Sequence, residues 1–230
     1  SQAARTPWAT VQHMARTVEV LPDAGAVFRR GAQFIAERAR VCTSERGTFS
    51  LALSGGRVEP MLELLDASDV PWEAMTVFQV DERVAPRGHP DRNLTKIEAG
   101  LPHARIVPMP VEEQDLWAAA SRYEELLPDR LDLVHLGLGP DGHTASLVPD
   151  CGALEIDDRD VAISREYNGR RRMTLTYPAI DRAYDVLWVV TGEDKAEPLA
   201  QLLAMDETIP AGRVRSPVQH VFTDQPVTYS

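Results

Sequence analysis

The sequence has few of the features that mark secreted or metal-binding proteins. Its 230 residues include only two cysteines, Cys42 and Cys151, which lie far apart without the C-x-x-C or Cys/His spacing of a zinc site. Two isolated thiols are typical of a reducing compartment, so we expect a cytoplasmic protein. We expect no metal site, because four further histidines also show no ligand spacing: His13, His89, His103 and His220.

Long apolar runs and excess positive charge are also missing. No stretch approaches the roughly 20 apolar residues that cross a membrane, and residues 1–10 lack a signal-peptide pattern. The formal net charge is −11, with 24 basic against 35 acidic residues, which excludes a broadly basic nucleic-acid surface. We therefore expect neither a membrane nor a nucleic acid as partner. A small anionic ligand stays open, because a few arginines in one place can bind it.

Nucleotide-binding loops are absent or poorly supported. The P-loop pattern G-x-x-x-x-G-K-[ST] does not occur, which argues against nucleotide hydrolysis. A G-x-G-x-x-G spans residues 137–142, but Pro149 leaves room for only one or two helical turns after it. Pro140 removes an N–H from the loop, and no suitable acid follows about 20 residues later. We therefore expect no cofactor, and a dinucleotide oxidoreductase is a remote alternative that a thermal shift with NAD or NADP would test.

Strand-like and helix-like segments alternate along most of the chain. Apolar runs predict strands at 49–53, 75–80, 105–107, 131–138, 186–190 and 219–222. Helical patterns cover 23–40, 61–65, 93–99, 112–127 and 193–203. Residues 161–164 and 173–176 are expected to form a small β-hairpin region around Asn168-Gly169. We predict a single α/β domain, residues 1–230, with an open, largely parallel Rossmann-like sheet and helices on both faces.

Chemically distinctive segments follow four of the predicted strands. They are "SGGR" (54–57), "DER" (81–83), "GPDGH" (139–143) and "TGEDK" (191–195). Each alone is more often a turn or a solvated loop. The carboxyl ends of parallel strands meet at one edge of a sheet, where such folds bind ligands, so we expect the four segments to converge.

The converging residues predict a site for a small phosphorylated molecule. A glycine pair between a strand and a helix directs backbone N–H groups at an anion. The residues expected to bind the anion are Gly55, Gly56, Arg57, Arg83, Arg172 and Lys195. The glycines around His143 place its imidazole over the sheet, where it can act as a base, and either Asp141 or Asp81 would orient it. His135, inside a predicted strand, is expected to be a packed core residue.

Four segments together resemble one enzyme family. "VFQVDERVAPRGHPDRN", "LDLVHLGLGPDGHTASLVP", "RRMTLTYPAIDRA" and "VLWVVTGEDKAEPLAQLL" are similar, in order and spacing, to the 6-phosphogluconolactonases from about Phe49 to Phe222. The resemblance implies hydrolysis of 6-phospho-D-glucono-1,5-lactone to 6-phospho-D-gluconate in the oxidative pentose phosphate pathway, without a cofactor. It implies His143 as general base, Asp81 and Arg83 in the substrate pocket, and Lys195 near the phosphate.

The chain departs from the family pattern at two places. "SGGRVE" stands where the family often has Ser-Gly-Gly-Ser-Thr-Pro, so Arg57 is an added candidate phosphate ligand and Glu59 an added negative charge. Arg92 stands where a serine commonly precedes the asparagine that corresponds to Asn93, which we count among the binding residues.

Two further functions stay open. Glucosamine-6-phosphate deaminases have the same fold, but their equivalent segment reads more like D-G-H-I-A-F-N-E-P, whereas "DGHTASLVP" follows the lactonase form. A non-catalytic sugar-phosphate sensor would usually carry a DNA-binding module, for which length and charge leave no room. The oligomeric state, monomer or homodimer, is open.

Overall fold

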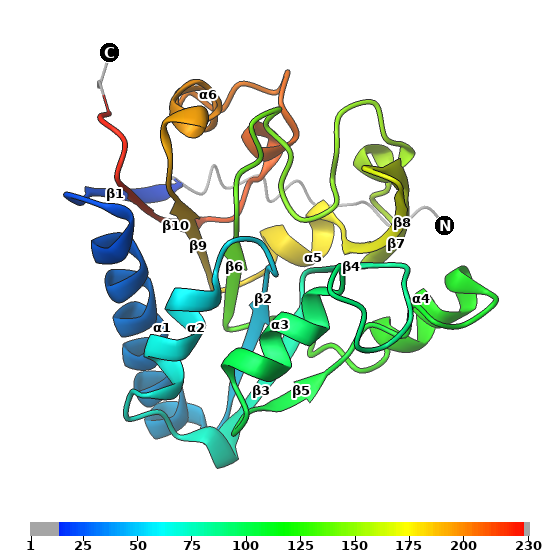
Figure 1. The fold of residues 1–230 in the computed structure, drawn as a ribbon, viewed down its shortest axis with the longest axis horizontal. Helices are drawn as coiled ribbons and strands as arrows, with labels where there is room; N and C mark the ends of the chain where they lie inside the picture. The colour runs from blue at the N-terminus through cyan, green and yellow to red at the C-terminus, as the bar shows by residue number, and fades with distance from the viewer. Residues whose placement is uncertain (1–13, 228–230) are drawn as a thin grey trace, which may run out of the picture.

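The computed structural model describes residues 14–227, so His13 lies outside the described residues. Its main feature is a sheet of seven parallel strands in the order β1-β10-β9-β6-β2-β3-β5 (Figure 1). The strands are β1 (Ala15–Val20), β2 (Phe49–Leu53), β3 (Met75–Gln79), β5 (Arg105–Val107), β6 (Leu133–Leu136), β9 (Asp185–Val190) and β10 (Val218–Thr223). The predicted open parallel sheet is therefore confirmed.

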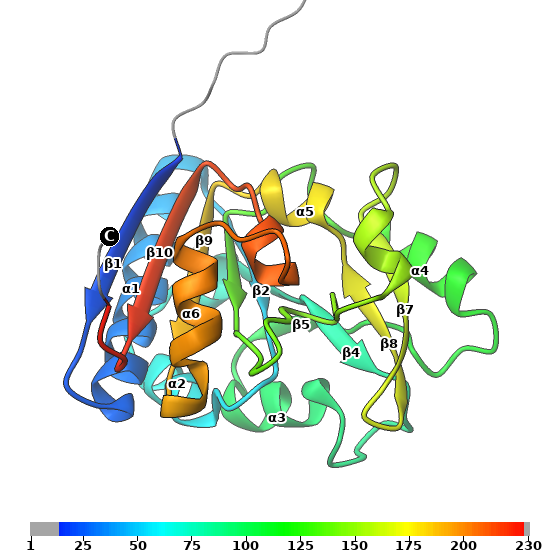
Figure 2. The same ribbon diagram turned by 90° about the horizontal axis from the view of Figure 1, so that it is seen from above.

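Helices cover both faces of the sheet, because its central strands bury side chains on two sides. In β2, Leu51 and Leu53 pack into one apolar core and Ala52 into the other, and Val77 and Phe78 of β3 divide in the same way. The first core contains α1 (Ala24–Arg46), α2 (Glu59–Asp66) and α3 (Asn93–Gly100). The second contains α4 (Leu116–Glu124), α5 (Tyr177–Asp181) and α6 (Ala196–Leu203). In Figure 2, α1 and α6 accordingly lie on opposite sides of β10 and β9.

A small antiparallel sheet lies beside the main one, on the side far from β1 (Figure 2). It consists of β4 (Asp81–Arg83), β8 (Arg170–Leu175) and β7 (Val161–Tyr167). The predicted hairpin is confirmed, and its turn residues Asn168 and Gly169 both have positive φ angles, 51° and 74°. Two residues with positive φ form the two-residue turn that matches the twist of a hairpin.

Several predicted boundaries were wrong, and the local chemistry explains them. The helix predicted at 112–127 begins only at Leu116, because the Asp115 carboxylate accepts hydrogen bonds from the N–H groups of Trp117 and Ala118 and so caps it. The segment 193–203 starts with a 3₁₀ turn, Glu193–Lys195, before α6. The predicted strand 131–138 is limited to Leu133–Leu136, and the first helix continues to Arg46.

Three elements were not predicted. "DER" is the strand β4 rather than a loop, β1 adds a strand at the edge of the main sheet, and α5 is a single short helix. Short 3₁₀ turns complete the described residues at Trp72–Ala74, Gly152–Glu155 and Pro210–Arg213. Within residues 14–227, no helix combines the length and apolar character needed to span a bilayer.

Candidate active site

The loop after β6 holds the imidazole of His143 against its own backbone. The N–H of Gly139 donates to the carbonyl of His143 at 2.8 Å, which closes the loop. A Cβ at Gly139 would lie 2.0 Å from Nδ1 of His143, so only glycine leaves room for the ring. Gly142 has a φ of 78°, a backbone conformation that favours glycine. The glycines therefore form a tight turn around the histidine. A dinucleotide site would require a helix directly after this turn, and none follows it in the structure.

Asp141 is the carboxylate that contacts His143. Its Oδ1 lies 2.5 Å from Nδ1 of His143 and also accepts from the backbone N–H of that residue at 3.2 Å. Its Oδ2 accepts from the hydroxyl of Tyr167 at 2.9 Å. Partial burial disfavours the charged carboxylate, but the hydrogen bonds from His143 and Tyr167 outweigh burial and lower the pKa of Asp141. Of the two acids considered from the sequence, the structure pairs Asp141 with the imidazole.

One cavity at the carboxyl ends of the central strands contains both the imidazole and positive charge. It has a volume of about 210 Å³, and Arg57, His143 and Lys195 are among its lining residues. Arg57 is exposed, and its family-atypical neighbour Glu59 pairs instead with Lys96 at 2.8 Å. Lys195 is mostly covered and lies 3.0 Å from Asp194. The segments after β2, β6 and β9 thus meet at one cavity, whereas "DER", the fourth segment predicted to converge, does not line it.

The two glycines after β2 differ in their relation to this cavity. Gly56 lines the cavity, and a Cβ there would find no atom within 4 Å. Gly55 is packed against Asn93, whose side chain would lie 2.3 Å from an added Cβ. Asn93 in turn donates from Nδ2 to the carbonyl and to Oδ1 of Asp81, at 2.9 and 3.1 Å. Asn93 therefore links the glycine loop to β4.

Asp81, Arg83 and Arg172 form a second group that is not among the residues lining this cavity. Asp81 is 4% exposed, and the hydroxyl of Ser146 donates to its Oδ2 at 2.6 Å. Burial raises the pKa of this carboxyl, and the hydrogen bond from Ser146 and the charges of Arg83 and Arg172 only partly oppose it. Arg83 Nη1 donates to the carbonyl of Asp91 at 2.9 Å. The side chain of Arg172 is buried beside Tyr167.

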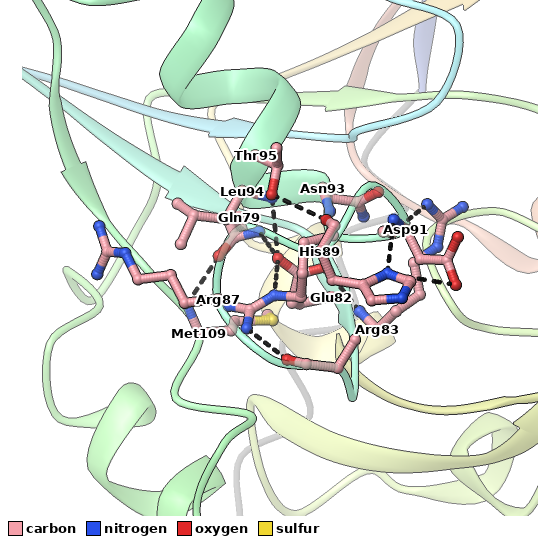
Figure 3. A network of polar contacts seen from close by, with 12 residues as sticks. Gln79, Glu82, Arg83, Arg87, His89, Asp91, Asn93, Leu94, Thr95 and Met109 are labelled. Atoms are coloured by element: carbon pink, nitrogen blue, oxygen red, sulfur yellow. Dashed lines mark hydrogen bonds and ion pairs between the residues drawn. The ribbon is translucent and has the colours of Figure 1, made fainter.

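Glu82 is a residue of this region that the sequence analysis did not select. Its side chain is completely buried, and Figure 3 shows it among Gln79, Asn93 and Leu94. Its oxygens accept hydrogen bonds of 2.7 to 2.9 Å from one amide side chain and three backbone N–H groups: Gln79 Nε2 and the N–H groups of Arg83, Asn93 and Leu94. The Arg92 guanidinium lies 2.9 Å away. Glu82 thereby satisfies the first N–H groups of α3, where no side-chain cap exists at Arg92.

The arrangement matches a known family over nearly the whole described chain. A sequence model of the glucosamine-6-phosphate isomerases/6-phosphogluconolactonase family matches residues 22–223. The chain belongs to this family. Two relatives named 6-phosphogluconolactonase, from Nostoc sp. and Synechocystis sp., are each 35% identical over 210 and 208 residues. Each alignment covers 83% of this chain and 86% of the relative.

Solved structures of family members have the same fold. The 6-phosphogluconolactonase from Thermotoga maritima is 25% identical with a TM-score of 0.81, covering 90% of this chain and 98% of that one. The enzyme from Trypanosoma brucei is 24% identical with a TM-score of 0.80, covering 91% and 95%. A monomeric glucosamine-6-phosphate deaminase has a TM-score of 0.77 at 18% identity, so the fold alone does not separate the two activities within the family.

Proposed function

We propose that this chain is a 6-phosphogluconolactonase, which hydrolyses 6-phospho-D-glucono-1,5-lactone to 6-phospho-D-gluconate. One observation carries the proposal: the imidazole of His143, hydrogen-bonded to Asp141, lines the same cavity as Arg57 and Lys195. A base and two cations in one cavity suit a substrate with a reactive carbonyl at one end and a phosphate at the other. The names of the two 35% identical relatives support the same activity.

In the proposed reaction, neutral His143 takes a proton from a water molecule whose oxygen attacks C1 of the lactone. Negative charge develops on the carbonyl oxygen, and this step requires nearby hydrogen-bond donors to stabilise it. The bond between C1 and the ring oxygen then breaks, and the imidazolium returns the proton to the departing ring oxygen. Asp141 on Nδ1 leaves Nε2 as the nitrogen that exchanges the proton with water. A lactone is an activated ester, so this route requires no covalent intermediate.

At the other end of the substrate, we assign the phosphate to Arg57, Lys195 and the backbone of Gly55 and Gly56. Arg57 and Lys195 supply charge, and Gly56 leaves its backbone open to the cavity, because no atom lies within 4 Å of the position that a Cβ would take there. Binding of the phosphate would hold C1 of the lactone near His143. Positioning of the substrate in this way contributes to the rate of hydrolysis.

The remaining predicted site residues receive supporting roles in this proposal. Arg83 and Arg172 lie near the buried carboxyl of Asp81, where their charges oppose its desolvation. Asn93 donates a hydrogen bond to Asp81, the first residue of β4, and its side chain packs against Gly55. We propose that these four residues support the site from outside the cavity that contains His143, and that Asp141 rather than Asp81 orients the base.

A coupled assay tests the proposal directly. Formation of 6-phosphogluconate is followed through 6-phosphogluconate dehydrogenase and NADP, with the spontaneous hydrolysis of the lactone subtracted. We expect turnover well above the spontaneous rate and no ammonia from glucosamine-6-phosphate. Ammonia release without lactone turnover would assign the chain to the deaminase branch of the family. Thermal stabilisation by 6-phosphogluconate, but much less by gluconate, would support the phosphate site separately.

The proposal also includes the setting of the enzyme. The substrate carries a phosphate that keeps it inside the compartment where it is made, so we propose that the enzyme acts in the cytoplasm.

The proposal includes a single α/β domain. The second apolar core contains residues from both sheets, including Met173 of β8 and Val134 of β6. This shared core supports a single α/β domain.

A further inference from the structure

Tyr167 brings a group from the small sheet to the proposed catalytic histidine. It is the last residue of β7, just before the Asn168-Gly169 turn. The pairing of β7 with β8 is irregular between Ser164 and Tyr167. Such irregularities re-aim a side chain next to an active site. Here the tyrosine meets Asp141, which lies 26 positions earlier in the chain.

The tyrosine contacts both members of the His143–Asp141 pair. Its hydroxyl donates to Oδ2 of Asp141 at 2.9 Å, while Oδ1 of the same carboxylate faces Nδ1 of His143. Its ring and the imidazole meet edge to face, with centroids 5.3 Å apart and an angle of 62°. The three groups therefore form a relay of contacts in which Tyr167 fixes the carboxylate and the carboxylate fixes the imidazole.

Arg172 holds the tyrosine in this position. Its guanidinium carbon lies 5.1 Å from the centroid of the Tyr167 ring, and its Nη2 donates to the Tyr167 carbonyl at 3.2 Å. Arg172 is only 5% exposed, so it cannot swing away into solvent without giving up these contacts. An arginine stacked on a tyrosine restricts the ring while leaving its hydroxyl free to donate.

We propose that Tyr167 is a positioning residue for lactone hydrolysis: it orients Asp141 and limits the negative charge that Asp141 presents to His143. This inference rests on the proposed function. A carboxylate that accepts a hydrogen bond from Tyr167 holds the imidazole in place but draws the proton onto it less strongly than an unbound carboxylate would. We therefore expect loss of the hydroxyl to favour the protonated imidazole, while Arg57 and Lys195, which line the same cavity from the segments after β2 and β9, act on the ring with and without the hydroxyl.

The test replaces Tyr167 by phenylalanine, which removes the hydroxyl and retains the ring against Arg172 and His143. We expect kcat to fall about five-fold, as for loss of one typical hydrogen bond, with KM within two-fold of the wild type. The acid limb of the pH–rate profile should move to higher pH by roughly half a unit, because the freed carboxylate holds the imidazole's proton more firmly. A tyrosine that served only folding would leave this limb in place.

Two controls complete the design. Tyr184 lies at the amino end of β9, whereas His143 lies at the carboxyl ends of the strands, and the Tyr184 ring packs against Arg130. Tyr184→Phe should therefore leave both kcat and the acid limb unchanged. In an Asp141→Asn background, Tyr167→Phe should cause no further shift of the limb, because its effect passes through the carboxylate.

The imidazole of His143 is also titrated by NMR without substrate, in wild type and in Tyr167→Phe. This readout stays valid even if the protein does not hydrolyse the lactone, so failure of the proposed function is recognised separately. A midpoint that rises in Tyr167→Phe, and does so only when Asp141 is present, supports the inference. An unchanged midpoint, or the same shift in the Asp141→Asn background, overturns it.

Discussion

Glu82 and Arg92 form an ion pair that is closed off from solvent: Nε of the arginine lies 2.9 Å from Oε2 of the glutamate, and their side chains are 2% and 0% exposed. The guanidinium also donates to the carbonyl of Ala85 at 2.8 Å. Arg92 thus joins the loop after β4 to the first turn of α3. Arg92, one of the two arginines that depart from the family pattern, is therefore a structural residue, and unlike Arg57 it does not line the proposed phosphate cavity.

The first prediction concerns this pair. Glu82→Gln should lower the free energy of unfolding by about 3 kcal/mol, because it leaves the buried Arg92 charge with only the half-exposed carboxylate of Glu112, 3.8 Å away. Urea unfolding followed by circular dichroism measures the change. The matched control is Glu155→Gln, whose carboxylate is 75% exposed and pairs with Arg213, and it should cost less than about 1 kcal/mol. Equal effects of the two substitutions would contradict the prediction.

The second prediction concerns Arg57. Arg57→Ala should raise KM for the lactone by roughly ten-fold or more and leave kcat nearly unchanged, since the phosphate is bound equally in the ground and transition states. Steady-state kinetics at fixed ionic strength provide the measurement. Glu59→Gln is the control, and it should be silent because Glu59 pairs with Lys96. An unchanged KM in Arg57→Ala would mean that the glycine loop and Lys195 suffice for the phosphate.

The main sheet and the meeting of its strand ends could be predicted from the sequence. The buried strand Val186–Val190 is a continuous apolar run, and Phe49–Leu53 is apolar except for Ser50. The end of the sheet at which such strands bind ligands follows from the topology of a parallel sheet. The contact of Asp141 with His143 was within reach because the two residues are two positions apart.

What could not be predicted depends on long-range pairing. Strand β4 has three residues and takes its strand conformation from β8, about 90 positions later in the chain. In the sequence, Glu82 resembles a solvent-exposed charged residue. Its burial becomes evident only when α3 is packed next to β4. The contact of Tyr167 with Asp141 depends on an irregular hairpin register that no local pattern specifies. The only local signal for Glu82 was the lack of a capping side chain at Arg92.

The third prediction concerns the close contact of Gly139 with the imidazole. Gly139→Ala should push the ring of His143 out of place and reduce kcat by at least ten-fold, because its Cβ would lie 2.0 Å from Nδ1. Gly152→Ala is the control, since a Cβ there meets no atom within 4 Å. Both variants should retain the fold by circular dichroism. Wild-type kcat in Gly139→Ala would show that the position of this ring does not limit the reaction.

The fourth prediction concerns His135, which is fully buried in β6, as expected from the sequence. Burial lowers the pKa of this imidazole from 6.5 to about 4. Between pH 6.5 and 4 the unfolded chain therefore binds a proton that the folded chain does not, so stability is present above pH 6.5 and is lost as the pH falls. This single group should contribute a loss of about 3 kcal/mol across that window.

Urea unfolding of wild type and His135→Leu at several pH values measures this contribution. The free energy of unfolding of the wild type relative to that of the variant should be highest at neutral pH. It should decrease as the pH falls to 4. Two parallel curves would show that the histidine does not cause the acid sensitivity.

The last prediction concerns His143 itself. His143→Asn should lower kcat by about 10² to 10⁴, the range for loss of a general base. Some rate should remain, because the lactone is intrinsically reactive and the cavity still positions it. Asparagine is smaller than the imidazole, so it fits beside Gly139, and binding of 6-phosphogluconate through Arg57 and Lys195 should change little.

The pH profile separates this role from a general loss of structure. Wild-type kcat should fall as the pH drops and the imidazole takes up a proton, because only the neutral ring can accept one from water. The His143→Asn variant should lose that acid limb and retain its affinity for 6-phosphogluconate. A variant that keeps both the wild-type kcat and the same acid limb would place the base elsewhere. Asp81 would be the next residue to test, because burial already raises the pKa of its carboxyl towards the range of a general base.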